Sequence, residues 1–460
     1  SGAAKLFETS DNSLVFKLPQ DTIKTIRDDV GVIDTSYTAK RTFENVQFAG
    51  GRATISTAGA TETFFGTGVL SDSNKREYYT ATCKVAGGGY AVGELIAFDG
   101  VGQTVTVNGP TNQTITFDDN TGTSSFTADI IATINIDSKQ EKIKSLSKSN
   151  VLNITGPNTT ALSSDSIAKS DVYKIHAVYD SGAAGTDAVL PTLTVANTAE
   201  TLTPGETITG ATSGATGIVV LGAGNTTSVT YVPVLGTFIV EPITGGISNF
   251  IKTVSSVAAG DTDIIAKYEL DTGQRDNFYD HGSIKLKAGE TGPSGRIAIV
   301  YDFFTHSCVG YLSADSYSAA IGFENIPTYL SPVTGTKVEL RDCVDFRPRR
   351  TDGATTMENI ELPKPNTNWS ADYSYYLPRI DRIFLSKEKK FGVNKGVPSL
   401  NTVPPQRLDG TMDLYTVYIP AYTFNSSDVT PEYIENKRYT MRDIGKLEKR
   451  INNLEYYTTL

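Results

Sequence analysis

The chain has 460 residues, more than one hydrophobic core normally organises, so we expect about two to four domains. Its formal net charge of −10 argues against nucleic-acid binding, because neutralising phosphates requires a surplus of Lys and Arg. The sequence has no apolar run of about 18 residues and no basic segment leading into an apolar one at its start. It therefore predicts neither membrane insertion nor a signal peptide.

The composition favours strands over helices. Thr, Tyr, Val and Ile, which suit a half-buried pleated surface, are abundant. One Trp, three Met and three His leave little material for aromatic pockets or histidine chemistry. We therefore predict an all-β fold of serial, Ig-like β-sandwich domains.

The first forty residues, 1–40, read as an extended N-terminal arm that contains a strand-like run at 13–19. From 41 to 180, short alternating runs such as 42–48 and 114–117 are separated by turn signals. This spacing is typical of a β-sandwich, with one face of each strand toward a core and the other toward water.

The composition changes between residues 181 and 260, where charged residues are rare and Thr, Gly, Val and Ala dominate. Glycines recur every few residues over 205–220, which suits the tight turns of a very small barrel. Residues 264–270 then resume the pattern of 172–179. We therefore predict a small β-barrel inserted into a loop of a larger sandwich.

Residues 261–350 continue the sandwich, with a strong apolar run at 296–304. Residues 351–435 are rich in Pro and Tyr, and strands are predicted at 379–385 and 413–420.

The last segment, 436–460, predicts an amphipathic helix. Its apolar residues are spaced three, four and three positions apart, as in a heptad, and are Ile444, Leu447, Ile451 and Leu454. An isolated helix of this length is marginal in water, so it needs a partner surface. The helix docks either on its own domain or against the same helix of neighbouring copies. We favour the start of a longer coiled coil, since the pattern is still running at Leu460.

An Asp-rich run at 271–282 offers oxygen ligands that could suit Ca²⁺. The spacing fits no EF-hand loop, and no Glu stands at the twelfth position. We favour a structural loop held by charge-assisted hydrogen bonds from Asp271, Arg275 and Asp276.

A second polar run, 340–350, alternates basic and acidic residues. An enzyme interpretation would make Cys343 a nucleophile, but it needs a general base, and the nearest histidine in sequence is His306. We favour a network of ion pairs with Cys343 as a small buried residue. The residues of this network are Arg341, Asp342, Asp345 and Arg347.

The cysteines and histidines are too scattered for a disulfide framework or a zinc site. The three cysteines are Cys83, Cys308 and Cys343, without a CxxC pair, which predicts reduced packing thiols. The histidine separations match no zinc motif. We predict no catalytic, cofactor-binding or metal-binding residue. Carboxylate pairs that hydrolyse glycosides stay open, because acids distant in sequence can meet in space.

Several ordered motifs in the last two hundred residues are similar to a domain family of unassigned function, found in virion proteins of T4-like cyanophages and other large tailed phages. These motifs are Leu270–Asp280, Tyr301–His306, Asp315–Tyr317, Leu340–Pro348, Tyr375–Ile383 and Arg438–Ile451. The segment around 205–217 resembles small modules scattered through phage tail proteins.

The resemblance implies a structural protein of a phage tail, either a baseplate or a tail-fibre component, with no catalytic residues to carry over. It implies a location in the virion, and in the host cytoplasm during assembly, with other tail or baseplate proteins as partners. We expect a homotrimer. Ile at position a with Leu at d often favours dimers, so the trimer follows from analogy with tail fibres.

Two alternatives remain. The chain could be a receptor-binding adhesin, with exposed tyrosines such as those at 373–376 stacking on a host surface glycan. It could instead be a polysaccharide depolymerase, for which release of reducing ends is the discriminating assay.

Overall fold

The computed structural model describes residues 4–5, 14–17, 35–57, 61–109, 111–139, 141–154, 167–196, 201–221, 227–248, 250–307, 310–322, 325–358, 360–365, 367–371, 377–399, 401–421, 423, 426–436 and 439–459. They divide into two units, the first ending with strand β30 (Asn368–Ala371) and the second beginning with strand β31 (Arg379–Leu385).

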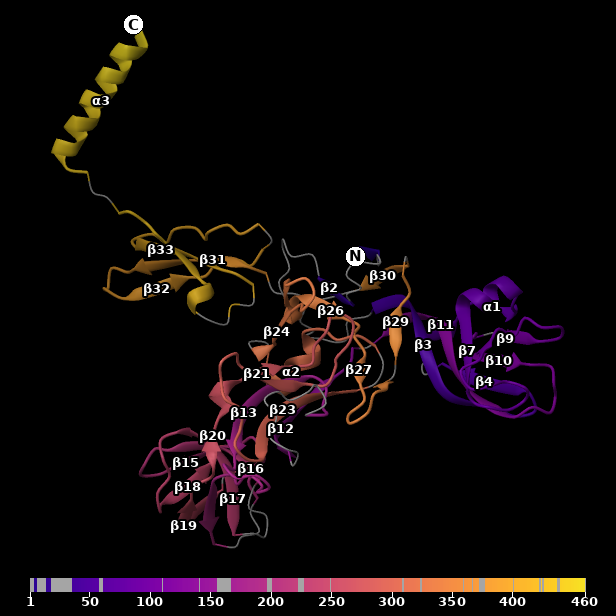
Figure 1. Ribbon diagram of the computed structural model, residues 1–460. Helices are drawn as coiled ribbons and strands as arrows, with labels where there is room; N and C mark the ends of the chain where they lie inside the picture. The colour runs from indigo at the N-terminus through magenta and orange to yellow at the C-terminus, as the bar shows by residue number, and fades with distance from the viewer. Residues whose placement is uncertain are drawn as a thin grey trace. The chain divides into compact units, whose positions relative to one another are not determined.

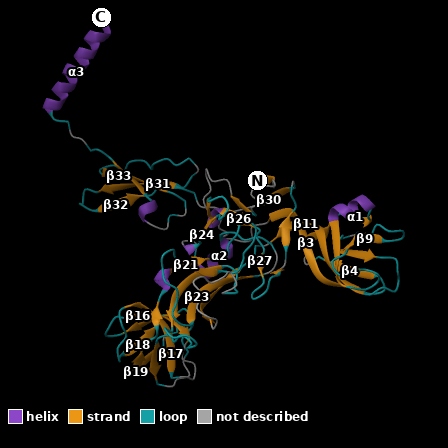
Figure 2. Cartoon of the chain, in the orientation of Figure 1, coloured by secondary structure: helices purple, strands orange, loops and turns teal. Residues whose placement is uncertain are grey.

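Strands dominate both units, and the all-β prediction is confirmed (Figure 2). The α-helices of the described residues are α1 (Asp72–Tyr78), α2 (Asp315–Ile321) and α3 (Met441–Thr459). None of the helices described is long and apolar enough to cross a membrane.

The first core lies between two antiparallel sheets. The larger sheet is built around the long pair β3 (Thr35–Phe48) and β11 (Phe126–Lys139). The smaller sheet contains β9 and β10, whose alternating residues are buried, as their apolar/polar pattern predicts. The other strands of these two sheets are β1 (Ala4–Lys5), β4 (Arg52–Ser56), β5 (Glu62–Phe64), β6 (Gly68–Val69), β7 (Tyr79–Val85), β8 (Leu95–Ile96), β9 (Thr104–Asn108), β10 (Thr114–Asp118), β29 (Glu361–Pro363) and β30.

The described part of the predicted N-terminal arm pairs with strands from far along the chain. Strand β2 (Val15–Lys17) pairs with β26 (Cys343–Asp345), and β1 pairs with β30. Strand β3 already begins at Thr35. The described residues of the segment expected to be an extended arm therefore contribute strands to sheets, where their backbone groups find partners. The remainder of 1–40 lies outside the described residues.

The second core is built on one sheet of β12 (Lys144–Ile154), β23 (Ile297–His306), β13 (Val172–Asp180) and β20 (Thr262–Asp263). Strand β23 is the apolar run predicted at 296–304, and eight consecutive side chains of it, from Ile297, are buried. Because β12 and β13 both pair with β23, the predicted sandwich 41–180 spans two different cores.

Shorter elements complete this core. Residues 265–267 form a 3₁₀ turn, and β21 pairs with β22, so 264–270 does not repeat the 172–179 strand as we expected. The residues that return to β13 are those of β20. The shorter strands are β21 (Tyr268–Asp271), β22 (Ser283–Leu286), β24 (Thr328–Leu330), β25 (Lys337–Glu339), β26, β27 (Arg349–Arg350) and β28 (Met357–Glu358).

A small closed barrel is inserted between β13 and β20, as the glycine-rich sequence predicts (Figure 1). Those two strands pair through Asp180 and Thr262, so the barrel leaves and re-enters the second core at neighbouring points. Its outward-facing Val220 and Val232 are buried against the sheet of the second core. The barrel strands are β14 (Thr192–Val195), β15 (Thr207–Gly210), β16 (Thr216–Leu221), β17 (Ser228–Leu235), β18 (Pro242–Gly245) and β19 (Ile251–Ala258).

The barrel contains an internal repeat that we did not identify from the sequence. Residues 206–210 and 241–245 share the pattern Glu-x-Ile-Thr-Gly, and the β15 and β18 strands within them pair antiparallel. The isoleucine of each copy is fully buried. The two copies are therefore related by an approximate two-fold axis between the strands.

Each copy's glutamate closes the turn of the other copy. The Glu206 carboxylate accepts hydrogen bonds from the N–H groups of Ile247 and Ser248, both at 2.7 Å, and from the Ser248 hydroxyl at 2.8 Å. A β-carbon on Gly245 would overlap that carboxylate, so the close approach needs glycine there.

The reciprocal contacts have the same form. The Glu241 carboxylate accepts from the N–H groups of Thr212 at 2.6 Å and Ser213 at 2.8 Å, and from the Ser213 hydroxyl. A β-carbon on Gly210 would overlap it in turn. Each half of the barrel therefore supplies the acceptor that satisfies the other half's turn.

The second unit is a sheet in the order β32–β31–β33–β34, followed by α3. Its strands β31 and β33 confirm the runs predicted at 379–385 and 413–420. The buried carboxylate of Asp413 on β33 accepts a hydrogen bond from Arg382 at 3.0 Å. The other strands are β32 (Phe391–Asn394), β33 (Met412–Ile419) and β34 (Thr430–Tyr433). The predicted region 351–435 is thus divided between the two units.

Candidate functional site

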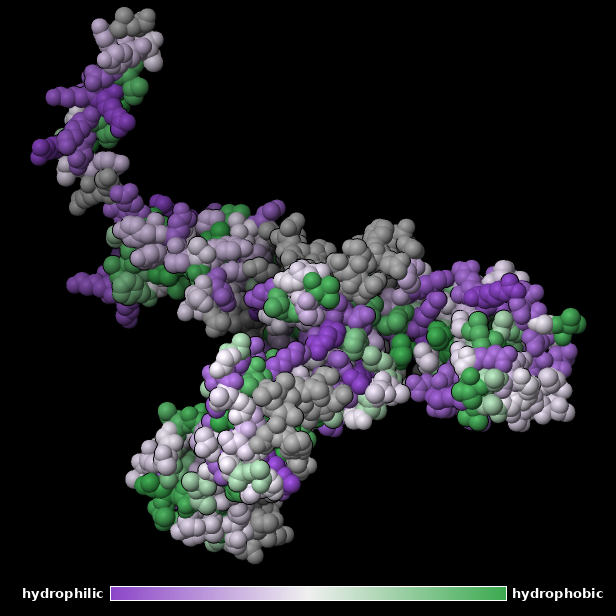
Figure 3. Space-filling view, viewed as in Figure 1, coloured by the Kyte–Doolittle hydropathy of each residue, from purple (hydrophilic) through white to green (hydrophobic). Residues whose placement is uncertain are grey.

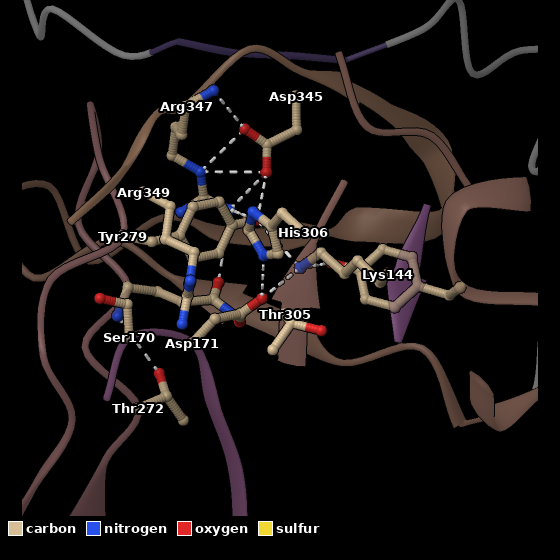
Figure 4. Close-up of polar contacts among 12 residues, drawn as sticks. Lys144, Ser170, Asp171, Thr272, Tyr279, Thr305, His306, Asp345, Arg347 and Arg349 are labelled. Atoms are coloured by element: carbon tan, nitrogen blue, oxygen red, sulfur yellow. Dashed lines mark hydrogen bonds and ion pairs between the residues drawn. The ribbon is translucent and has the colours of Figure 1, made fainter. Parts of the chain in front are cut away.

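Two features stand out: a buried charged network in the second core, and an exposed apolar stripe on α3. The network joins β12, the start of β13, the end of β23 and β26, with Tyr279 between its two halves (Figure 4). Burying charge in a protein is costly unless each charge is paired and hydrogen-bonded. The pairing of these charges therefore decides whether any of them is available to bind a ligand.

The first half is an ion pair between Lys144 and Asp171. The Lys144 ammonium lies 2.6 Å from Asp171 Oδ2, and the two side chains are 0% and 1% exposed. The ammonium also donates to the Tyr317 hydroxyl at 2.8 Å and lies 4.6 Å from the centre of the Tyr279 ring. His306 Nε2 lies 2.7 Å from the same Asp171 oxygen.

The pKa shifts follow from this pairing. Burial favours the neutral acid, but the Lys144 charge and the His306 hydrogen bond outweigh it, so the pKa of Asp171 is lowered. Burial, with the nearby Lys144 charge, lowers the pKa of His306 to about 4. His306 is therefore neutral at pH 7, and its Nε2–H donates to Asp171.

The second half is a bidentate pair between Arg347 and Asp345. Arg347 Nη2 lies 2.8 Å from Asp345 Oδ2, and Arg347 Nε lies 3.0 Å from Oδ1, with the Arg347 side chain fully buried. Arg347 Nη2 also donates to the Tyr279 hydroxyl at 3.0 Å. The Tyr279 hydroxyl donates in turn to Asp345, and burial raises the pKa of Tyr279 well above its ordinary value.

The Asp-rich loop is attached to this second half. Arg275 donates to both oxygens of Asp271 at 2.9 and 3.0 Å, and its carbonyl accepts from Arg347 at 2.9 Å. Asp276 accepts from the hydroxyls of Tyr329 and Ser331. Burial by itself would raise the pKa of Asp271, but the hydrogen bonds from Arg275 and Lys285 outweigh burial and lower that pKa to about 2. Among the described residues, no group of three or more His, Cys, Asp or Glu is arranged to hold a metal ion.

The structure thus brings two sequence motifs to one place, although about seventy residues separate them. Arg341 and Asp342 lie in the 3₁₀ turn Leu340–Asp342, and the Asp342 side chain lies outside what is described. Cys343 is buried, and its thiol donates to the Glu339 carbonyl. His306, the base that a Cys343 nucleophile would need, binds Asp171 instead.

Among the described residues, two pockets lie near the charged network. One pocket of about 470 Å³ is lined by residues such as Tyr173, Lys174 and His176, and another of about 360 Å³ by Asp271 and Arg275. Lys144, His306, Asp345 and Arg347 line neither. The network holds strands together; it does not present charge to a ligand in these pockets.

The second feature is the stripe along α3. Figure 3 shows hydrophobic atoms along one side of this helix and hydrophilic ones along the other. The heptad residues are large and apolar, yet their exposed fractions are 49% for Ile444, 43% for Leu447, 54% for Ile451 and 59% for Leu454. No residue of α3 is buried. The stripe is therefore not packed on the chain's own sheet.

A capping interaction fixes the start of α3. The backbone N–H and hydroxyl of Thr440 both donate to the Asp443 carboxylate, at 3.1 and 2.7 Å, and the Asp443 N–H reaches back to the Thr440 hydroxyl at 3.4 Å. This reciprocal arrangement satisfies donors that a helix start leaves free. This interaction therefore defines the first turn of α3.

From the sequence we did not single out Lys144 or Asp171, and we noted Tyr317 only as part of the motif Asp315–Tyr317. Lys144 pairs with Asp171, 27 residues away, and with Tyr317, 173 residues away. A single Lys at the start of a polar strand ordinarily faces water. The other residues of the network all lie inside motifs that we named from the sequence, and they are His306, Tyr279, Tyr317, Asp345 and Arg347.

The chain was compared with known families, curated proteins and solved structures. The searches of curated proteins and of solved structures found no match to this chain. A family match covers residues 332–460, a stretch that includes Asp345, Arg347 and all of α3. That part of the chain is similar to a domain of unknown function (DUF4815).

Proposed function

We propose that this chain is a non-enzymatic structural component of a phage tail, a baseplate or tail-fibre protein that builds or anchors an elongated oligomeric fibre. The observation that carries the proposal is the apolar stripe of α3, whose four heptad residues are all more than two-fifths exposed. A stripe of that kind on a capped helix is stable in water only when another apolar surface covers it.

The rest of the molecule supports the same proposal. The chain folds into several β cores, and the buried charges of the second core are paired internally, as suits a rigid support. In this proposal α3 begins a coiled coil, three copies associate through it, and the sandwich has an Ig-like arrangement. Its partners are other tail or baseplate proteins, and it is located in the virion.

The joining role is tested by removing the stripe. We expect the wild-type chain to sediment as a trimer, and the double substitution Leu447→Asp with Ile451→Asp to sediment as a monomer, because buried carboxylates would destabilise the apolar seam. The matched control is Lys446→Asp with Lys449→Asp, on the hydrophilic side of the same helix. β-Sheet circular dichroism of all three proteins should be the same. A wild-type chain that is monomeric at every concentration contradicts the proposal.

A second candidate function is a receptor-binding adhesin that contacts host surface glycans. One observation favours it: the open pocket of about 470 Å³ combines an aromatic ring, Tyr173, with the polar side chains of Lys174 and Asn325. Sugar rings commonly lie against aromatic faces while polar groups bind their hydroxyls. A glycan array probed with the wild-type chain and with Tyr173→Ala distinguishes this role, since binding that survives the substitution excludes this pocket. Tyr373–Tyr376 lie outside the described residues.

A further inference from the structure

The charges beside the α3 stripe are placed to select the orientation of a neighbouring copy. With Ile444 and Ile451 at heptad position a, Arg450 occupies position g and Glu455 position e. Both residues are exposed, and within the described residues neither side chain makes an ion pair. Side chains at e and g flank the apolar seam, and their charges set partner choice and orientation in coiled coils.

In a parallel, in-register arrangement, position g of one helix meets position e five residues further along its neighbour. Arg450 then faces Glu455 of the neighbouring copy, an opposite-charge pair that repeats at every interface of the bundle. The antiparallel arrangement with full overlap, in which Ile444 lies opposite Leu454, places Arg450 near Arg450 and Glu448 near Glu448 of the other copy. Those contacts join like charges, so the charge pattern favours the parallel form.

One contact in the parallel form is unfavourable by sequence alone. Asp443 at position g would face Glu448 at position e of the neighbour. The Asp443 carboxylate, however, already accepts hydrogen bonds from the backbone N–H and the hydroxyl of Thr440. It is drawn back toward the helix N-terminus, where negative charge is stabilised. The Arg450–Glu455 pair is therefore left as the main charged contact that sets orientation.

We propose that α3 binds the α3 of other copies of this chain in parallel and in register, with Arg450 of each copy donating to Glu455 of its neighbour. This inference rests on the proposed joining function and adds its geometry. Because α3 follows the β sheets in the chain, all copies then enter the seam from the same end. The β domains of every copy consequently leave the bundle at one end, which gives the assembly a direction.

Charge reversal tests the orientation directly. In the parallel form, Arg450→Glu and Glu455→Arg each create a like-charge contact at every interface, and we expect each to weaken association by roughly tenfold. The double variant, Arg450→Glu with Glu455→Arg, restores the opposite-charge pair and should recover wild-type association. Lys449→Glu, on the outer face, is the matched control and should change little.

The antiparallel form gives a different result, because Glu455 then faces no Arg450. Single variants that associate like the wild type, or a double variant that stays as weak as the singles, would overturn the parallel assignment. A wild-type chain that does not associate at all instead overturns the joining function itself. Sedimentation equilibrium at about 0.1 M and 1 M salt supplies the readout, since the difference between singles and wild type should shrink at high salt. Circular dichroism checks that every variant is folded.

Discussion

The barrel and the second core bury carboxylates in two different ways. Within the described residues, Glu206 and Glu241 pair with no Lys or Arg, and their oxygens accept from backbone N–H groups and serine hydroxyls. Asp171 and Asp345 instead face Lys144 and Arg347 directly. Backbone donors are fixed by the turn that carries them, whereas a buried ion pair removes two full charges from water, and their attraction must offset that cost.

The difference lies in what a substitution leaves behind. In the barrel, each glutamate satisfies a turn of the other copy and faces no cation within the described residues, so its loss leaves no unpaired charge. In the second core, loss of one member of Lys144–Asp171 or Arg347–Asp345 leaves the other charge buried and unpaired. We therefore expect substitution of either barrel glutamate to lower stability by a similar, small amount. Substitution within a buried ion pair of the second core should lower stability more.

The largest effect is expected from Arg347→Ala. This change leaves the buried carboxylate of Asp345 without its charged partner, and removal of one member of a buried pair costs about 3–5 kcal/mol. Denaturant unfolding followed on tyrosine fluorescence measures the loss. The matched control is Lys285→Ala, because Lys285 pairs with Asp271 but its own side chain is 63% exposed. If Arg347→Ala lowers the free energy of unfolding by less than about 1 kcal/mol, the value typical of an exposed ion pair, the buried pair is no more important than an exposed one.

The next effect is the pH dependence that His306 gives to the second core. The pKa of His306 is about 4 in the folded chain, below the value near 6.5 expected when it is unfolded. The unfolded state therefore binds more protons between about pH 6.5 and 4. The contribution of His306 to stability is complete above about pH 6.5 and declines as the pH falls through 4, by at most about 3 kcal/mol.

Hydrogen–deuterium exchange of peptides from β12 and β23 measures this local stability. We expect protection to weaken over that pH window in the wild type, after correction for intrinsic exchange rates, and to do so much less in His306→Gln. Barrel peptides from β15 and β18 serve as the internal control, because no histidine lies in them. Equal pH dependence in His306→Gln and the wild type would show that His306 is not the responsible group.

The smallest effects are expected in the barrel. Glu206→Gln keeps the shape of the side chain but replaces charge-assisted hydrogen bonds with weaker ones, which should cost about 1–3 kcal/mol. Because the contacts are reciprocal, Glu241→Gln should weaken protection of β15 and β18 to a similar degree. Exchange protection in each single variant measures both. A strong loss of protection in one variant and none in the other would show that the two glutamates do not contribute equally to stability.

The sequence predicted well what depends on short-range pattern. The alternation of Val105 with Val107 and of Ile115 with Phe117 identified β9 and β10, and the spaced glycines identified a small barrel. The heptad spacing identified the α3 helix, because period is a local property of the chain. Each of these features is decided by neighbours within a few residues.

What the sequence did not predict depends on contacts between distant residues. The border between the first two cores lies near residue 140, because β12 pairs with β23, about 150 residues later. The pairing of Lys144 with Asp171 follows from that same sheet and from no local motif. The reciprocal glutamates were visible as a short repeat, but the repeat is imperfect, with Thr207 in one copy and Pro242 in the other.

Light scattering coupled to size exclusion, applied to the wild-type chain over a wide range of concentrations, tests the central claim that copies of this chain join through α3. The account predicts a molar mass of three chains that decreases on dilution and falls to one chain when the stripe carries Leu447→Asp and Ile451→Asp. A constant mass of one chain, or a mass of three chains that those substitutions leave unchanged, would contradict it.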